Sequence, residues 1–158
     1  MFTPRQQGIF RPLVQRAWAS YCEREGREAG NRTERDNWYR GELLTVIGVD
    51  STKDCDQVRD FDSIVAHFAI LANDAFWIDR TSKASEIRMR YWIGRRLSDL
   101  DKLTNQEHHW DYVVGIYRHM NLPADMEDCP AQLLWKVFQA LDTHVRRIFN
   151  SRTPAMAS

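Results

Sequence analysis

Apolar side chains recur every three to four residues along most of the chain, and this spacing places them on one face of an α-helix. The pattern predicts helices over residues 11–25, 34–47, 60–72, 85–103, 105–120 and 130–148. Outside these stretches, apolar and polar residues do not alternate with a period of two over the length of a strand. The sequence therefore predicts an all-α fold, a compact bundle of about six helices without a sheet.

Turn residues separate the predicted helices. Gly48 follows the last apolar residues of one helix, and glycine there adopts the left-handed conformation that ends helices without a steric penalty. Thr104 is the expected N-cap of the helix over 105–120, because Glu107 stands three positions later, as in a capping box. Residues 76–78, Phe-Trp-Ile, are too apolar for a free loop and are expected to pack.

Chain length and helix stops set the predicted boundaries. For 158 residues, a single helical domain over residues 1–150 is the expectation. Pro12 is tolerated only near the start of a helix, so residues 1–10 are predicted to form an N-terminal arm. Residues 151–158, SRTPAMAS, are predicted to be a flexible tail.

Hydropathy and cysteine usage indicate a cytoplasmic protein. No run approaches the roughly 18 apolar residues that a membrane span needs, so no membrane contact is predicted. Arg5, Arg11 and Pro12 interrupt the N-terminal stretch, which therefore lacks the continuous apolar core of a signal peptide. The three cysteines show no CxxC spacing, and reduced thiols in a reducing compartment are the simplest account of them.

The charges of the chain cancel in sum but not in position. There are 22 basic and 22 acidic residues, and 18 of the basic residues are arginine. Residues 1–40 carry a net charge of +3, residues 41–79 a net −6 and residues 80–103 a net +4. Two interpretations follow: the blocks neutralise one another between helices, or they form separate acidic and basic patches that bind partners.

The helix predicted over residues 86–103 is the strongest binding candidate in the sequence. Its basic residues are Arg88, Arg90, Arg95, Arg96 and Lys102. Tyr91 and Trp92 lie among them, and phosphate pairing combined with base stacking on aromatic rings is how single nucleic-acid strands are held. An acidic protein is the other candidate ligand. The structural alternative is a solvated basic face that pairs with the acidic block of residues 41–79.

Four aspartates precede or begin the helix over 60–72. They are Asp54, Asp56, Asp60 and Asp62, and they form a candidate acidic patch. If this stretch were the second half of a helix-turn-helix, the aspartates would repel DNA phosphates. A Ca²⁺ loop starting at Asp50 would need glycine at its sixth position, where Cys55 stands. Helix capping and a solvated acidic face are favoured, and no metal site is predicted.

The common catalytic signatures do not occur. The five histidines form neither HExxH nor a Cys/His zinc spacing, and His67, beside an apolar stripe, is expected to be a packed histidine. No GxSxG motif or phosphate-binding glycine-rich loop occurs. The sequence thus predicts a protein that is not an enzyme, with no catalytic residues and no cofactor.

Several short motifs resemble the phage Mu GemA regulatory family. They are Tyr39-Arg40, Leu43-Leu44, Gly48-Val49 with Ser51, Lys53-Asp54, the helix with Phe61, Val65 and Phe68, and Tyr112-Val113-Val114-Gly115-Ile116 with Met120, followed by residues 133–141. The resemblance implies a protein encoded by a phage or prophage that modulates gene expression or DNA topology. It implies no catalytic residues.

Together these observations give one leading hypothesis and two alternatives. The leading hypothesis is a phage-type regulatory protein that acts by binding a host or phage protein, because zero net charge supplies no general attraction to phosphates. The first alternative is direct binding of DNA or RNA through the helix over residues 86–103. The second is a metal-dependent nuclease that uses the aspartates.

Overall fold

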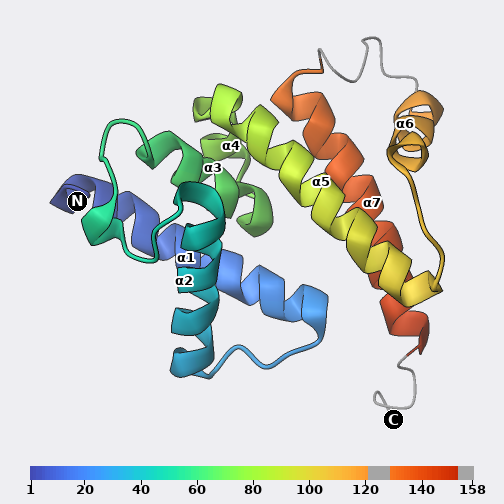
Figure 1. The fold of residues 1–158 in the computed structure, drawn as a ribbon, viewed down its shortest axis with the longest axis horizontal. Helices are drawn as coiled ribbons and strands as arrows, with labels where there is room; N and C mark the ends of the chain where they lie inside the picture. Colours follow the sequence, from blue (N-terminus) through green and yellow to red (C-terminus); the bar gives the residue numbers. More distant parts are fainter. Residues whose placement is uncertain (121–128, 153–158) are drawn as a thin grey trace. The chain divides into compact units, whose positions relative to one another are not determined.

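The computed structural model describes residues 1–120 and 129–152, and the regular structure within these ranges is entirely helical (Figure 1). The elements are α1 (Pro4–Glu25), α2 (Arg32–Ile47), the 3-10 helix η1 (Thr52–Asp54), α3 (Phe61–Ala72), α4 (Ala75–Arg80), α5 (Ser82–Thr104), α6 (Trp110–His119) and α7 (Ala131–Arg152). The prediction of an all-α fold without a sheet is confirmed for these residues. The short helix α4 and the 3-10 helix η1 are the elements that the apolar pattern did not predict.

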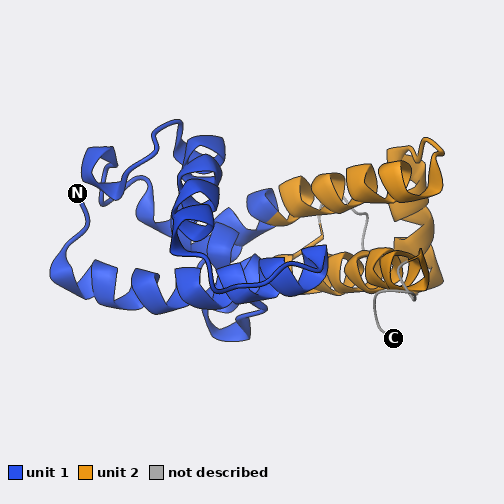
Figure 2. Ribbon diagram, turned by 90° about the horizontal axis from the view of Figure 1, so that it is seen from below, with its two compact units in different colours: residues 1–88 blue, residues 89–158 orange. Residues whose placement is uncertain are grey.

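The chain forms two compact units (Figure 2). Unit 1 comprises residues 1–88, from α1 to the first residues of α5, and unit 2 comprises residues 89–158. A single domain over residues 1–150 stays a prediction, since two compact units can belong to one domain.

Helix α1 begins at Pro4, so the start predicted near Arg11 is wrong. The Thr3 hydroxyl accepts the Gln6 N–H at 3.2 Å, and the Gln6 side chain accepts the Thr3 N–H at 2.8 Å, which completes a capping box. Proline is favoured in the first helical turn because the N–H it lacks has no partner there. Pro12 lies inside α1 on its exposed side, where the helix continues past it.

The N-terminal residues also pack instead of extending as an arm. Phe2 is only 4% exposed, and its ring makes edge contacts with Phe10 and Phe61 at centroid distances of 5.6 and 5.3 Å. Such pairs add to the free energy gained from burying the rings. Phe2 and Phe10 therefore belong to the core of unit 1, and they hold residues 1–10 against it.

Helix α3 is the centre of unit 1. All of its residues from Ile64 to Leu71 are buried, and α1, α2 and α4 pack against it. Phe68 makes ring contacts with Phe10 of α1 and with Trp38 of α2, each at a centroid distance of 5.6 Å. Aromatic contacts thus join the three longest helices that lie wholly within this unit.

In unit 2, α7 contacts α6 and is connected to α5 by an ion pair described below. The helix predicted over residues 105–120 starts later than expected: α6 begins at Trp110, so the predicted start is wrong. The Thr104 hydroxyl donates back to the Leu100 carbonyl at 2.8 Å, so it extends α5 instead of capping α6. Asp101 accepts both the backbone N–H of His108 and its ring Nδ1, at 2.8 and 2.7 Å, which fixes the connection between the helices.

The end of α7 includes part of the predicted tail. Ser151 and Arg152 are helical, whereas the remainder of the tail, residues 153–158, lies outside the described residues. Among the described helices, none combines the length and the apolar character needed to cross a membrane.

Candidate binding groove

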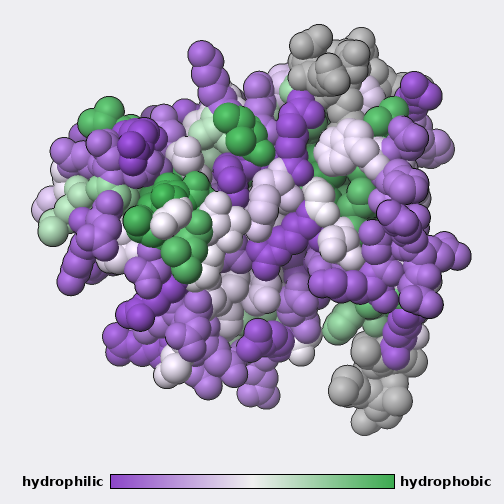
Figure 3. All heavy atoms as spheres, viewed as in Figure 1, coloured by the Kyte–Doolittle hydropathy of each residue, from purple (hydrophilic) through white to green (hydrophobic). Residues whose placement is uncertain are grey.

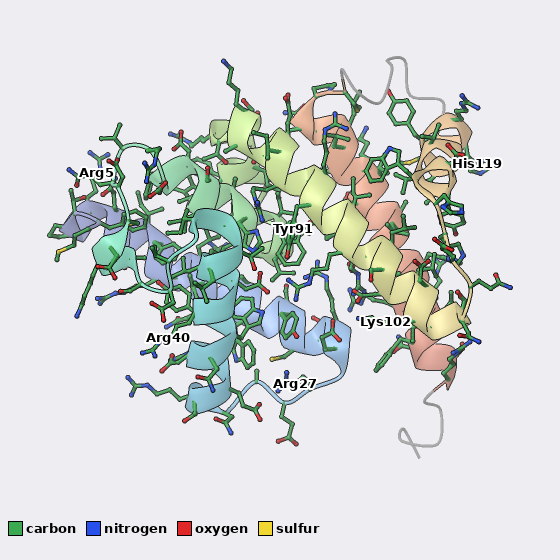
Figure 4. All side chains as sticks on the ribbon, in the orientation of Figure 1. Arg5, Arg27, Arg40, Tyr91, Lys102 and His119 are labelled. Carbon is green, nitrogen blue, oxygen red and sulfur yellow. The ribbon has the colours of Figure 1, made fainter. Side chains whose placement is uncertain are left out.

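An open groove of about 1370 Å³ lies in unit 1 between α1, α2 and the chain that follows α2. We name it the basic groove; its polar lining residues are Gln7, Arg11 and Gln15 of α1, Arg32, Arg35, Asp36, Tyr39 and Arg40 of α2, and Asp50, Ser51, Thr52 and Lys53. Figure 4 shows Arg40 projecting from α2. The walls formed by α1 and α2 are each one face of a helix, since their polar lining residues recur at intervals of three to four positions.

Local sequence signals place these walls. Asn31 caps α2 by accepting the Glu34 N–H at 3.1 Å, so the helical face begins at Arg32. Gly48 ends the helix with φ of 76°, the left-handed conformation expected from the sequence. The chain then turns back, and the Ser51 hydroxyl accepts the Lys53 N–H at 3.2 Å, which starts η1 at the end of the basic groove.

Polar hydrogen-bond donors lie at the base of the basic groove. The ring of Tyr39 packs on Phe10 at a centroid distance of 5.8 Å. Burial raises the pKa of the Tyr39 hydroxyl to about 12, which outweighs the lowering effect of its hydrogen bond with Thr52. The hydroxyl therefore keeps its proton at neutral pH. Gln7 Nε2 donates to the Thr52 hydroxyl at 3.4 Å.

The basic groove has an excess of positive charge. Its lining includes five basic and two acidic side chains, a net charge of +3 in a chain whose formal charge is zero. Asp36 is the nearest acid to two of the arginines, with Oδ2 at 3.9 Å from Arg32 Nε and Oδ1 at 3.7 Å from Arg35 Nε. Ion pairs at such distances on the surface contribute little.

Three of the cations have no such neighbour. Arg11, Arg40 and Lys53 are exposed, and within the described ranges no carboxylate lies within ion-pair distance of them. Their charge is therefore available to a ligand.

One of the predicted binding residues of α5, Arg96, is buried and paired with carboxylates. Arg96 is 5% exposed, and its guanidinium lies 2.9 Å from Asp99 Oδ2 and 3.0 Å from Asp142 Oδ1. The contact of Arg96 Nε with Asp142 is close but not aligned as a hydrogen bond. Both acids lie outside the block of residues 41–79 that was the expected neutralising partner. Arg96 thus stabilises unit 2 from within.

The other four predicted residues are divided between the units. Arg88 belongs to unit 1, where it contacts a histidine described below, whereas Arg90, Arg95 and Lys102 belong to unit 2. The Arg95 guanidinium lies over the ring of the buried Trp92 at 5.0 Å, and Arg90 and Arg95 make further interactions. Lys102 is exposed.

Two of the predicted acidic residues organise the turn before α3. Asp56 Oδ1 accepts the backbone N–H groups of Val58 and Arg59, each at 2.8 Å, and these bonds lower the pKa of Asp56. Asp60 Oδ2 accepts the Asp56 N–H at 2.9 Å, and the hydrogen bond from the Arg59 side chain is the main cause of the lowered pKa of Asp60. Asp54 and Asp62 are exposed. Over the described residues, no group of His, Cys, Asp and Glu is arranged to hold a metal ion.

A buried polar chain in unit 1 was not predicted. His67 is fully buried, as expected of a packed histidine, and its Nε2 lies 2.8 Å from Glu42 Oε2. Arg88 donates to His67 Nδ1 from Nε at 3.2 Å. Because a guanidinium can only donate, Nδ1 accepts and we assign the neutral ring's proton to Nε2, which donates to Glu42. The three residues connect α2, α3 and α5, and their separation in sequence left no signal of the contact.

The cations of the basic groove had a signal in the sequence. Residues 1–40 form a block with a net charge of +3, and Arg35 and Arg40 lie on the helix predicted over residues 34–47, with Arg32 just before it. The block over residues 80–103 is the stronger candidate for a binding site by sequence alone, because its charge is denser and aromatic residues lie among its basic residues.

Over the described residues, the protein is all-helical and unit 1 carries a groove with a net positive lining. No model of a known protein family matches the chain, and neither a curated protein nor a solved structure matches it. The resemblance to the phage Mu GemA family therefore stays a prediction that rests on its motifs.

Proposed function

We propose that this protein is a regulatory protein that acts by binding a macromolecule, without catalysing a reaction, and that the basic groove is its binding surface. The observation that carries the proposal is the uncompensated positive charge of the basic groove in a chain of zero formal charge. Such a local field attracts partners that present negative groups, even though the whole protein has no general attraction for them.

The size and composition of the basic groove favour a chain segment as its ligand. Its volume of about 1370 Å³ exceeds the roughly 300–1,000 Å³ of typical small-molecule sites. Four of its five cations are arginine, whose planar guanidinium binds phosphate and carboxylate groups with two parallel hydrogen bonds.

The resemblance to the phage Mu GemA family suggests the biological setting. Tyr39, Arg40, Ser51 and Lys53 belong to the motifs that carry the resemblance, and all four line the basic groove. Gly48, another of those residues, ends α2 and so positions the last two. We accordingly place the protein among phage- or prophage-encoded regulators, with a macromolecule of the host or the phage as its partner.

A protein partner that binds apolar surface is the second candidate. Leu44 is 52% exposed and Val58 is 85% exposed, both in unit 1. Figure 3 shows apolar side chains gathering near the C-terminal end of α2, next to polar surface. Exposed apolar patches of this kind mark protein interaction sites.

Affinity capture from a lysate of a bacterial host tests the proposal. The wild type is compared with Arg11→Glu/Arg40→Glu, which reverses charge in the basic groove, and with Arg118→Glu/Arg147→Glu, which changes net charge equally on exposed arginines of unit 2. We expect the wild type and the unit 2 variant to retain the same partner and the groove variant to lose it. Equal capture by all three proteins would show that the basic groove does not bind the partner. A fourth protein, Leu44→Ser, tests the apolar surface: loss of the partner from this variant alone would favour that surface.

A further inference from the structure

The cations of the basic groove form an elongated arrangement. Arg32 and Arg40 are eight residues apart on α2, with Arg35 between them, so they span about 12 Å along the helix axis. Arg11 lies on the opposite wall, and Lys53 lies on the segment that follows α2. Positive charge therefore lies on all three segments that line the basic groove.

This arrangement fits the backbone of one nucleic-acid strand. Each strand of duplex DNA carries one charge per about 3.4 Å of helix axis. A single strand is more extended, so the cations on α2 cover a length of roughly two to four nucleotides. A positively charged groove that follows the backbone is the usual way in which proteins bind single strands. Duplex recognition instead needs a protruding helix or ribbon that enters the major groove, whereas these cations line a concave surface.

From this match we infer that the basic groove binds a single strand of DNA or RNA, an inference that rests on the proposed function and names the chemistry of its partner. The phosphates contact the arginines of both walls. Tyr39, whose hydroxyl keeps its proton, and the polar side chains of Gln7 and Thr52 supply hydrogen-bond donors at the base for phosphate or base oxygens.

An acidic protein segment fits less well. Segments that dock in grooves as helices or extended chains are anchored by apolar side chains that enter pockets. Of the large apolar residues at the basic groove, Phe2 and Phe10 are 4% and 2% exposed because they already pack in the core, whereas Met1 is 68% exposed. A single exposed methionine is a small anchor for such a segment, while five of the seven charged side chains are cationic, which suits a phosphate backbone.

Fluorescence anisotropy with labelled 20-nucleotide probes tests the inference. The probes are mixed-sequence single-stranded DNA, the RNA of the same sequence, the DNA duplex, and a polyglutamate peptide of equal charge, all at 50 mM salt. We expect one or both single strands to bind at least tenfold more tightly than the duplex and the peptide. If neither single strand binds, or if the peptide binds as tightly as the better strand, the inference is wrong.

Matched variants locate the binding. Arg11→Ala/Arg40→Ala should weaken single-strand affinity at least tenfold and, by removing two phosphate contacts, reduce the slope of log affinity against log salt by about 1.4. Arg118→Ala/Arg147→Ala should bind as the wild type does. Equal loss in both variants would show that binding is diffuse and would overturn the inference.

The capture experiment separates this inference from the proposed function. If the single strands do not bind but the charge-reversed groove variant still loses its partner, the partner is a protein and only the inference fails. If the groove variant captures the same partner as the wild type, the proposed function fails as well. Nuclease treatment of the lysate should release the partner if a nucleic acid is what the basic groove holds.

Discussion

Arginines of unit 1 and of unit 2 differ in burial and in their pairing with carboxylates. Arg96 in unit 2 is buried between Asp99 and Asp142, and its charge is neutralised within the fold. Arg11 and Arg40 in unit 1 are exposed, and no carboxylate of the described residues pairs with them. The comparison shows that the density of basic residues along a sequence does not reveal which cations the fold neutralises; the distance of each cation from the nearest carboxylate does.

The largest expected effect lies in unit 2. Arg96→Ala removes one partner of a buried ion pair, whose other partner, Asp142, is only 6% exposed. We expect the free energy of unfolding to fall by about 3 kcal/mol, as measured by urea unfolding. A loss comparable to that of a surface substitution would mean that Arg96 is not the structural arginine described here.

The next largest effect is expected in the hydrogen-bonded network of Glu42, His67 and Arg88 in unit 1. His67→Leu keeps an apolar side chain in the core but leaves Glu42 without the imidazole N–H and Arg88 without the Nδ1 acceptor. We expect a loss of about 2 kcal/mol, the cost of leaving buried polar groups unsatisfied. The triple change of His67, Glu42 and Arg88 to apolar residues should recover part of that loss, and no recovery would contradict this account of the network.

A smaller effect should appear at acid pH. The pKa values of Asp56 and Asp60 are lowered in the folded protein, so their stabilisation is present above the ordinary aspartate pKa of about 3.9 and is lost as the pH falls through the folded-state values. The melting temperature should therefore decrease below about pH 4. Asp60→Asn should lower the melting temperature at pH 7 and reduce the further decrease in acid; an unchanged pH profile would exclude this role.

The smallest effect on stability is expected in the basic groove. Arg11→Ala/Arg40→Ala removes exposed side chains without an ion pair, so the free energy of unfolding should change by less than about 0.5 kcal/mol for each substitution. Urea unfolding alongside Arg96→Ala gives the contrast between the two kinds of arginine. A large loss would show that Arg11 or Arg40 supports the fold.

Much of the fold could be predicted from the sequence because helix formation depends on local spacing. The apolar stripes gave the long helices, and Gly48 gave the end of α2. The start of α1 was misplaced because Pro12 was interpreted as an early helical residue, whereas the capping box at Thr3 lies eight residues further upstream than Arg11. Packing decides between these two possible starts of α1, because Phe2 is buried in the core.

The candidate site was less predictable for a physical reason. The row of arginines on α2 follows from helical periodicity, but the basic groove exists only because α1 and the chain around η1 come beside that row. Likewise, the neutralisation of Arg96 depends on Asp142, which is 46 residues away in sequence. Contacts between distant segments decide which charges are paired within the fold and which remain exposed. Local sequence patterns do not reveal these contacts.

The central claim is that groove arginines recognise a ligand while Arg96 holds unit 2 together. The most direct test follows the arginine side-chain Nε–H signals by NMR during titration with the tighter-binding single strand. The account predicts that the signals of Arg11, Arg32 and Arg40 shift with the titration and that the signal of Arg96 stays in place. Shifts confined to arginines of unit 2, with those of the basic groove unchanged, would contradict it.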